Sequence, residues 1–284
     1  MSIQIEQPAP GARAKTIVLS KDGTLIAFDR TGHGLPVILV DGALCYRGMG
    51  PSKQLTEMLA RDFTVFSYDR RGRGESGDTA PYAVEREVED IAALLKEAGG
   101  TAFVWGMSSG AVLALEAAIR LPGIEKLALY EAPLILDEAR PTTEDDWHRI
   151  REAVAADRPG DAVSLFLRSV GVPRFFIGLM RLMPVWRKLA AIAHTLPYDG
   201  AIVGVYQTGK PLPAGSWASL KIPTLVMDGG KSPEWMRRAN QALAAALPKA
   251  SHRTLAGQTH DIDAKVLAPA LARFYAFIDM NPSG

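Results

Sequence analysis

Residues 102–120 read AFVWGMSSGAVLALEAAIR, and this stretch decides the fold. Its first part, 102–106, is an apolar run typical of a strand, and 111–120 has the pattern of a helix. Between them, Ser108 has a glycine two positions away on each side, which could simply mark a short loop. The alternative is a sharp strand-to-helix turn whose strained backbone pushes the Ser108 hydroxyl into a cleft above a sheet. Gly106 and Gly110 would then be needed because a side chain there would collide with the neighbouring strand or helix.

On both sides of this turn, segments typical of strands alternate with segments typical of helices. The expected strands are 15–20 and 24–32 (a hairpin), 36–42, 63–69, 102–106, 126–130, 223–230 and one near 252–256. The expected helices are one near 51–61, then 84–98, 111–120, 233–247 and 268–278. This order predicts an α/β fold with a mostly parallel central sheet and helices on both faces.

Between 134 and 213 the pattern is helical, with no convincing strand. Such an insert after the sixth strand predicts a cap, or lid, over an active-site cleft, although the helices could also merely pad the core. The expected division is therefore a core of 1–133 and 214–284 and a helical cap of 134–213.

The insert carries Met and aromatic side chains at helical spacing, which usually pack in a core. A cap must nevertheless show one face to the cleft, and such side chains suit an irregular apolar substrate. The candidate substrate contacts are Trp186, His194, Tyr198 and Met183.

Composition excludes several classes of function. The formal net charge is +1, from 32 Lys and Arg against 31 Asp and Glu, without a long basic block, which argues against a nucleic-acid partner. We expect no membrane association, because the sequence has no apolar run of about 18 residues. A single cysteine, Cys45, and no signal-like N-terminus indicate a cytoplasmic protein. We expect a monomer or homodimer.

No cofactor or metal is expected. The sequence has no glycine-rich loop followed by Lys-Ser/Thr, no dinucleotide-binding fingerprint after the first strand, and no His-x-x-His or Glu-x-x-His spacing.

A serine hydroxyl is a poor nucleophile at neutral pH and needs a general base within hydrogen-bond reach. Of the five histidines, His260 falls in the loop between the last strand and the last helix, at the same end of the sheet as Ser108. We therefore predict His260 as the base. The developing oxyanion needs N–H donors. One is expected from Ser109, and a second from Ala43 or Gly42 in the loop after 36–42.

From about residue 16 to 278 the chain resembles the α/β-hydrolases. The matching pieces, in family order, are VILVDGA, YDRRGRGES, GMSSG, PTLVMDGGKSP and GQTH. The resemblance implies the α/β-hydrolase fold and makes YDRRGRGES, with its three arginines, a structural turn rather than a phosphate site. It also implies a catalytic triad completed by a carboxylate.

Most members carry that acid after the penultimate strand, where this chain has Ser232. Glu131, at the end of 126–130, is similarly placed to the acid of certain haloalkane dehalogenases and of the zearalenone lactone hydrolases. The lactone hydrolases also resemble this chain in the Asp-Gly after the third strand and in a Ser-Ser-Gly elbow. We favour Glu131 as the acid, with Asp228 as the alternative. Asp41 stands where many relatives have histidine, and a buried carboxylate that fixes its loop is the expected role.

The sequence thus predicts a cofactor-independent serine hydrolase that cleaves an ester or lactone of a mainly hydrophobic small molecule through an acyl-enzyme on Ser108. A haloperoxidase-like perhydrolase, a carbon–carbon bond hydrolase or a hydroxynitrile lyase could use the same triad. A small-molecule receptor built on a hydrolase scaffold is a further alternative, suggested by Ser232. Serine rather than aspartate at 108 argues against epoxide hydrolysis and dehalogenation.

Overall fold

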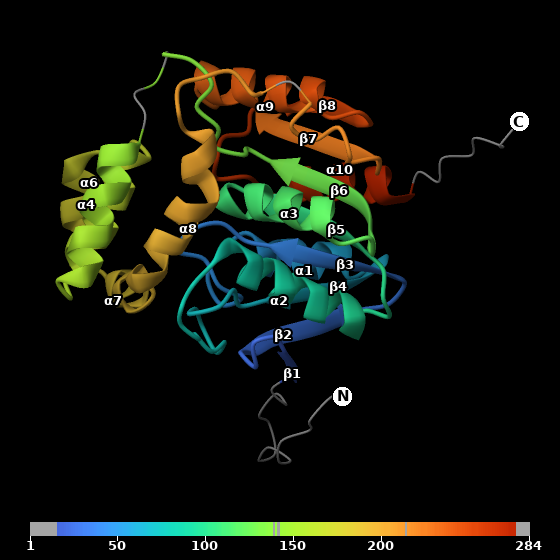
Figure 1. Ribbon diagram of the computed structural model, residues 1–284, viewed down its shortest axis with the longest axis horizontal. Coiled ribbons are helices and arrows are strands. Elements are labelled where there is room, and N and C mark those ends of the chain that lie inside the picture. Colours follow the sequence, from blue (N-terminus) through green and yellow to red (C-terminus); the bar gives the residue numbers. More distant parts are fainter. Residues whose placement is uncertain (1–15, 139, 141–142, 214, 277–284) are drawn as a thin grey trace, which may run out of the picture.

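The computed structural model of the chain describes residues 16–138, 140, 143–213 and 215–276 (Figure 1). Its centre is an eight-stranded sheet of order β1-β2-β4-β3-β5-β6-β7-β8. β1 and β2 form an antiparallel hairpin, β2 pairs antiparallel with β4, and the remaining neighbours are parallel. The strands are β1 Thr16–Leu19, β2 Leu25–Gly32, β3 Leu35–Val40, β4 Phe63–Tyr68, β5 Ala102–Met107, β6 Ile124–Tyr130, β7 Thr224–Gly229 and β8 Ala250–Leu255.

Helices cover both faces of this sheet, as the strand–helix alternation predicts. α2 (Val84–Glu97), α3 (Ser109–Arg120) and α9 (Glu234–Ala246) pack on one face. α1 (Ser52–Leu59) and α10 (Ala264–Ala276) pack on the other. β4 and β5 are buried along their whole length. Their side chains alternate between the two cores, with Val104 on one face of the sheet and Trp105 on the other. The expected α/β class is confirmed.

Several element boundaries differ from the prediction by one or two residues, and the last helix differs most. The last helix begins at Ala264 rather than 268, because the Asp263 carboxylate accepts a hydrogen bond from the N–H of Lys265 (2.8 Å) and so caps an earlier first turn. Pro269 therefore lies inside the helix instead of opening it. The last two residues of the predicted helix, 277 and 278, lie outside the described residues, as does Lys15 of the first strand.

The segment between β6 and β7 forms α4 (Glu144–Ala155), α5 (Pro159–Ser169), α6 (Arg174–Met180), α7 (Pro184–Ala191) and α8 (Leu196–Val203), with short 3₁₀ turns at Ala193–Thr195 and Gly204–Tyr206. Within 143–213 it contains no strand. Figure 1 shows α4, α6 and α7 standing away from the sheet, with α8 between them and α3. The two ends of the segment are joined, because the Ile135 carbonyl accepts a hydrogen bond from the N–H of Gly209 (2.9 Å).

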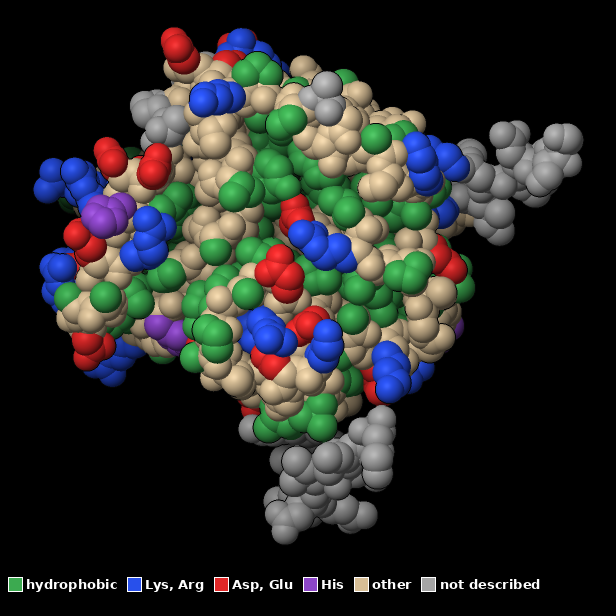
Figure 2. Space-filling model, in the orientation of Figure 1, with side chains coloured by type: hydrophobic (Ala, Val, Ile, Leu, Met, Phe, Trp, Pro, Cys, Tyr) green, Lys and Arg blue, Asp and Glu red, His purple; other side chains and the backbone are tan. Residues whose placement is uncertain are grey.

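The surface carries both signs of charge. On the face shown in Figure 2, acidic and basic side chains lie interspersed, in keeping with the formal net charge of +1. None of the helices in the described part of the chain combines the length and apolar character that a membrane span requires.

The carboxyl ends of the central parallel strands meet at one edge of the sheet. Val40 pairs with Gly106, Met107 with Tyr130, and Tyr130 with Met227. The loops that follow β3, β5, β6 and β7 therefore start at the same edge of the sheet, although Val40 and Met227 are 187 positions apart in the sequence. This edge is where a ligand site is expected in a parallel α/β sheet.

The turn from β5 to α3 is tightly constrained. Ser108 has φ 56°, in the left-handed region that residues other than glycine rarely adopt. A Cβ at Gly106 would lie 2.4 Å from the carbonyl oxygen of Gly110, and a Cβ at Gly110 would lie 2.3 Å from that of Val40. Both contacts are with backbone, which cannot rotate away. A side chain at Gly106 would push α3 away from β5, and one at Gly110 would push α3 away from β3.

Gly110→Ala should lower the free energy of unfolding by about 3 kcal/mol, because the added methyl overlaps the β3 backbone. Urea denaturation measures the change. Gly178→Ala is the matched control: it lies in α6 with no atom within 4 Å of an added Cβ, so stability should stay constant or rise by up to about 1 kcal/mol. Equal destabilisation by both substitutions would contradict the steric explanation.

Candidate active site

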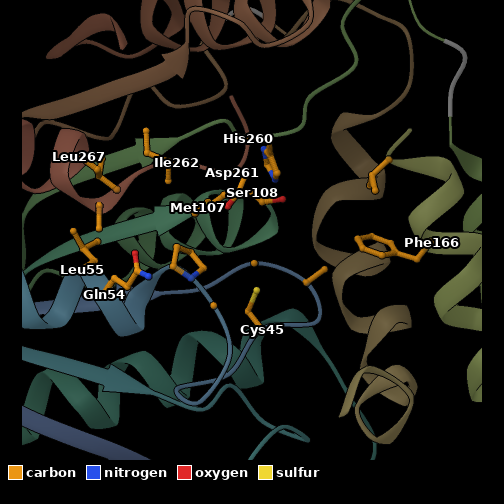
Figure 3. A pocket seen from close by; sticks show the side chains of 16 residues that line it. Cys45, Gln54, Leu55, Met107, Ser108, Phe166, His260, Asp261, Ile262 and Leu267 are labelled. Atoms are coloured by element: carbon orange, nitrogen blue, oxygen red, sulfur yellow. The ribbon is translucent and has the colours of Figure 1, made fainter. Parts of the chain in front are cut away.

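Ser108 faces a cavity of about 510 Å³ at the carboxyl edge of the sheet. It is the residue before α3, and its N–H donates to the carbonyl of Tyr130 on β6 (3.0 Å). The cavity walls come from the loop after β3, from α1, from α5 of the insertion and from the start of α10. Figure 3 shows these side chains, which include Ala43, Cys45, Gln54, Leu55, Met107, Phe166, Val170, Asp261, Ile262 and Leu267.

His260 lies next to Ser108 in the view of Figure 3, and both side chains line the same cavity. His260 follows β8 in the loop that leads to α10. Its Nδ1 is 2.7 Å from Oε2 of Glu131. A carboxylate only accepts hydrogen bonds, so Nδ1 carries the proton in this contact, and in the neutral imidazole the lone pair is on Nε2. The imidazole is about half exposed, whereas the Glu131 carboxylate is fully buried behind it.

Glu131 is fixed by its backbone as well as by its side chain. It directly follows β6 with φ 48°, and its N–H donates to the carbonyl of Met227 on β7 (3.0 Å). Oε1 accepts a hydrogen bond from the N–H of Gly229 (2.8 Å). Burial alone would raise the pKa of Glu131, but the His260 and Gly229 hydrogen bonds and the nearby Ser232 hydroxyl together lower it below its ordinary value. Glu131 is therefore a carboxylate at neutral pH.

Ser232 occupies the position for which the resemblance implies an acid in most members. Its hydroxyl is buried and, although it makes no hydrogen bond of standard geometry, it contributes to the lowered pKa of Glu131. Residue 232 is thus a neutral neighbour of a carboxylate that the adjacent strand supplies.

Asp228, the alternative acid, lies one residue before the end of β7 and is fully buried. Its Oδ2 is 2.6 Å from Nε2 of His252 on β8. The structure therefore places Asp228 against a different histidine, and His260 is in contact with Glu131.

The expected oxyanion donors lie beside the serine. Ser109 follows it directly and is buried at the start of α3. Gly42 is so close that a Cβ built on it would be 2.9 Å from Cβ of Ser108, and Gly42 and Ala43 both line the cavity. The loop after β3 and the first turn of α3 thus meet at the serine.

Asp41 ties this loop to α1. Its Oδ2 accepts a hydrogen bond from the Ser52 hydroxyl (2.5 Å), and Oδ1 accepts one from the Ser52 N–H (3.3 Å). Burial raises the pKa of Asp41 to about 6, with the Ser52 hydrogen bonds opposing the shift.

Cys45 also lines the cavity, and its position bears on whether it can act as a nucleophile. Burial raises the pKa of its thiol to about 12, so the reactive thiolate is not populated at neutral pH.

Two of the cap residues expected to contact substrate lie away from this cavity, at the junction between the insertion and the core. The Tyr198 ring stacks on that of Tyr82 at 3.8 Å between centroids, and its hydroxyl donates to Asp78 (2.9 Å). Nε2 of His194 lies 3.5 Å from the same carboxylate. Both side chains therefore hold the insertion against the loop after β4 and do not line the cavity around Ser108.

The other two cap residues also lie elsewhere. The Trp186 ring packs under the guanidinium of Arg181 at 5.4 Å, and Met183 is half exposed at the surface. The insertion reaches the cavity instead through Phe166 and Val170, at the end of α5. Helical spacing identifies apolar residues but does not say which of them faces the cleft, so the sequence could not select these two.

In the described part of the chain, no group of three or more His, Cys, Asp or Glu side chains is arranged to hold a metal ion. The side chains gathered at the cavity are a serine with a strained backbone, an oriented imidazole and a buried carboxylate in contact with it.

The sequence pattern of the alpha/beta hydrolase family matches residues 33–270, and the chain belongs to this family. It is therefore a hydrolase, as the resemblance implied. Its fold is similar to the crystal structure of an alpha/beta hydrolase from Sphaerobacter thermophilus, with 48% sequence identity and a TM-score of 0.83. That similarity covers 91% of this chain and 99% of the other.

Two further proteins are similar at lower identity. YraK, an uncharacterized hydrolase of Bacillus subtilis, is 26% identical over 220 residues, which cover 72% of this chain and 79% of YraK. The enol-lactonase of Burkholderia xenovorans shares the fold, with a TM-score of 0.65 and 19% identity over 92% of this chain and all of the other.

Asp41→Asn should change how stability depends on pH. The folded-state pKa of about 6 exceeds the ordinary 3.8, so the folded protein keeps a proton that the unfolded chain releases, and stability falls as pH rises through this window. From pH 4.5 to 7.5 the wild-type chain should lose about 2 kcal/mol relative to the Asn variant. Urea denaturation of both proteins at the two pH values measures this, and a pH-independent difference would contradict it.

Proposed function

We propose that the chain hydrolyses carboxylic esters or lactones of neutral, mainly apolar small molecules through an acyl-enzyme on Ser108. The observation that supports this is the arrangement at one cavity of the Ser108 elbow, the His260 imidazole, and the buried Glu131 carboxylate 2.7 Å from Nδ1. These are the parts that serine-based acyl transfer requires.

In this mechanism, Nε2 of His260 takes the proton of the Ser108 hydroxyl as the oxygen attacks the substrate carbonyl. Glu131 holds the ring and stabilises the imidazolium. The oxyanion is bound by the N–H of Ser109 and by that of Ala43 or Gly42. His260 then gives its proton to the leaving alcohol, and a water activated by the same imidazole releases the acid and regenerates Ser108.

The cavity favours a neutral substrate. Its volume of about 510 Å³ suits a small molecule, and its wall is mostly apolar, with Leu55, Phe166 and Ile262 among the lining residues. Among the described residues that line it, none is Lys or Arg, so a substrate carboxylate would enter without a lysine or arginine partner from them. Lactones are included because an enol-lactonase shares the fold.

The insertion at 134–213 acts as a cap in this proposal, because Phe166 on α5 and Val170 directly after this helix close one side of the cavity. A cytoplasmic location accords with a single cysteine that forms no intrachain disulfide. The receptor alternative is weakened, since its motivation was a missing acid and Glu131 contacts His260.

Ser108→Ala should lower kcat for p-nitrophenyl butanoate at least about 10³-fold, because it removes the nucleophile. Wild-type protein should be labelled at Ser108 by a fluorophosphonate probe, with the site located by mass spectrometry. Ser251→Ala, at an exposed serine on β8, is the control and should keep both turnover and labelling. Unchanged turnover in Ser108→Ala would remove Ser108 from the mechanism, and unlabelled wild-type protein without turnover would favour a receptor.

Glu131→Gln and Asp228→Asn form a matched pair, since each replaces a buried carboxylate in contact with a histidine by its amide. Glu131→Gln should lower kcat about 10³-fold, because the amide can neither fix the proton on Nδ1 nor stabilise the imidazolium. Asp228→Asn should leave kcat within a few-fold. Steady-state kinetics of both variants measure this. A larger loss of kcat in Asp228→Asn than in Glu131→Gln would reverse the assignment of the acid.

A further inference from the structure

Asp199 lies in α8 of the insertion, and its carboxylate is fully buried between two arginines of the loop after β4. Oδ2 accepts a hydrogen bond from Nη2 of Arg73 (2.7 Å), and Oδ1 accepts one from Nη1 of Arg70 (2.8 Å). Burial alone would raise the pKa of Asp199, but the Arg73 and Arg70 charges lower it below its ordinary value. The carboxylate is therefore charged, although it is not part of the cavity lining.

This carboxylate contacts the first of the two expected oxyanion donors. The hydroxyl of Ser109 donates to Oδ1 of Asp199 (2.7 Å). Because the side chain of Ser109 is fixed in this way, the first residue of α3 cannot shift its backbone N–H relative to Ser108 without breaking a buried charge-assisted hydrogen bond.

Of the two candidates for the second donor, Ala43 is the one reached through Arg73. Nη1 of Arg73 donates to the carbonyl oxygen of Gly42 (2.6 Å), while Nη2 of the same guanidinium is bound to Asp199. The Gly42 carbonyl and the Ala43 N–H belong to one trans peptide unit and point in opposite directions. Arg73 thus fixes the direction of the Ala43 N–H, and its charge polarises that amide as a donor.

We propose that Asp199 is a positioning residue through which the insertion holds both oxyanion donors in place, directly at Ser109 and through Arg73 at the Gly42–Ala43 peptide. This inference rests on the proposed function. It gives the insertion a part in the rate of the reaction in addition to covering the cavity. A fixed pair of donors favours the charged tetrahedral state over the bound substrate, so its loss should reduce kcat and leave KM nearly unchanged.

Asp199→Asn tests this with p-nitrophenyl butanoate as substrate and butylboronic acid as an inhibitor that forms a tetrahedral adduct on a reactive serine. We expect kcat to fall by about 10- to 100-fold with KM within about threefold. The inhibition constant of the boronic acid should rise by the same factor as kcat/KM falls, because the adduct places an oxygen between the same donors.

Asp90→Asn is the matched control. Asp90 is equally buried and pairs with Arg71 of the same loop at 2.7 and 2.8 Å, but its ion pair reaches neither Ser109 nor Gly42. Asp90→Asn should lose stability to a similar extent as Asp199→Asn and keep kcat within about threefold of the wild type.

Ser109→Ala is the milder second variant, because it removes only the hydroxyl and retains the N–H. It should fold like the wild type and lose about 5- to 10-fold in kcat at constant KM.

Unchanged kcat in both Asp199→Asn and Ser109→Ala would overturn the inference. So would an equal loss of kcat in Asp90→Asn, since the effect would then follow stability rather than donor position. If Asp199→Asn does not fold, Ser109→Ala decides alone. A wild-type chain without turnover would instead show that the proposed function itself fails, and this inference with it.

Discussion

The close approach of three backbone segments around Ser108 sets the positions of the other parts of the site. Gly106 and Gly110 let α3 start within contact distance of β3 and β5, and the left-handed φ of Ser108 turns the chain sharply between them. The same contact brings the loop after β3 against the serine, so that Gly42 lies beside its side chain and Ala43 lines the same cavity. A helix start that lay even a methyl group farther away would leave the serine without these neighbours.

The position of the acid shows how parallel strands allow one contact to be supplied from either of two neighbours. β6 and β7 are adjacent and in register, so a carboxylate directly after β6 and one in the turn after β7 can both reach the loop that carries His260. Here Glu131 provides the contact, and the β7 side contributes the N–H of Gly229 and the buried hydroxyl of Ser232. The carboxylate is thereby held from both strands.

Much of this could be predicted from the sequence, because strand ends are readable and parallel strands bring their ends together. Ser108, His260 and Glu131 each follow a strand, and the structure places them at one edge. The residues of the insertion that face the cavity could not be predicted, since an apolar helix face does not reveal its partner. Nor could the contact of Arg73 with Asp199, 126 positions apart, be read from a motif that looked like a structural turn.

The anchoring of α8 divides the insertion into two parts with different freedom to change. Asp199 and Thr195 are bound to the core by buried hydrogen bonds. The end of α5, in contrast, brings Phe166 and the following Val170 to the cavity. α6 exposes apolar side chains such as Phe175 to solvent. Substitutions at the cavity-facing end of α5 can therefore alter which molecules fit while leaving the buried ion pairs intact. In evolutionary terms, such a protein can change its substrate through its outer helices while its inner helix stays constrained.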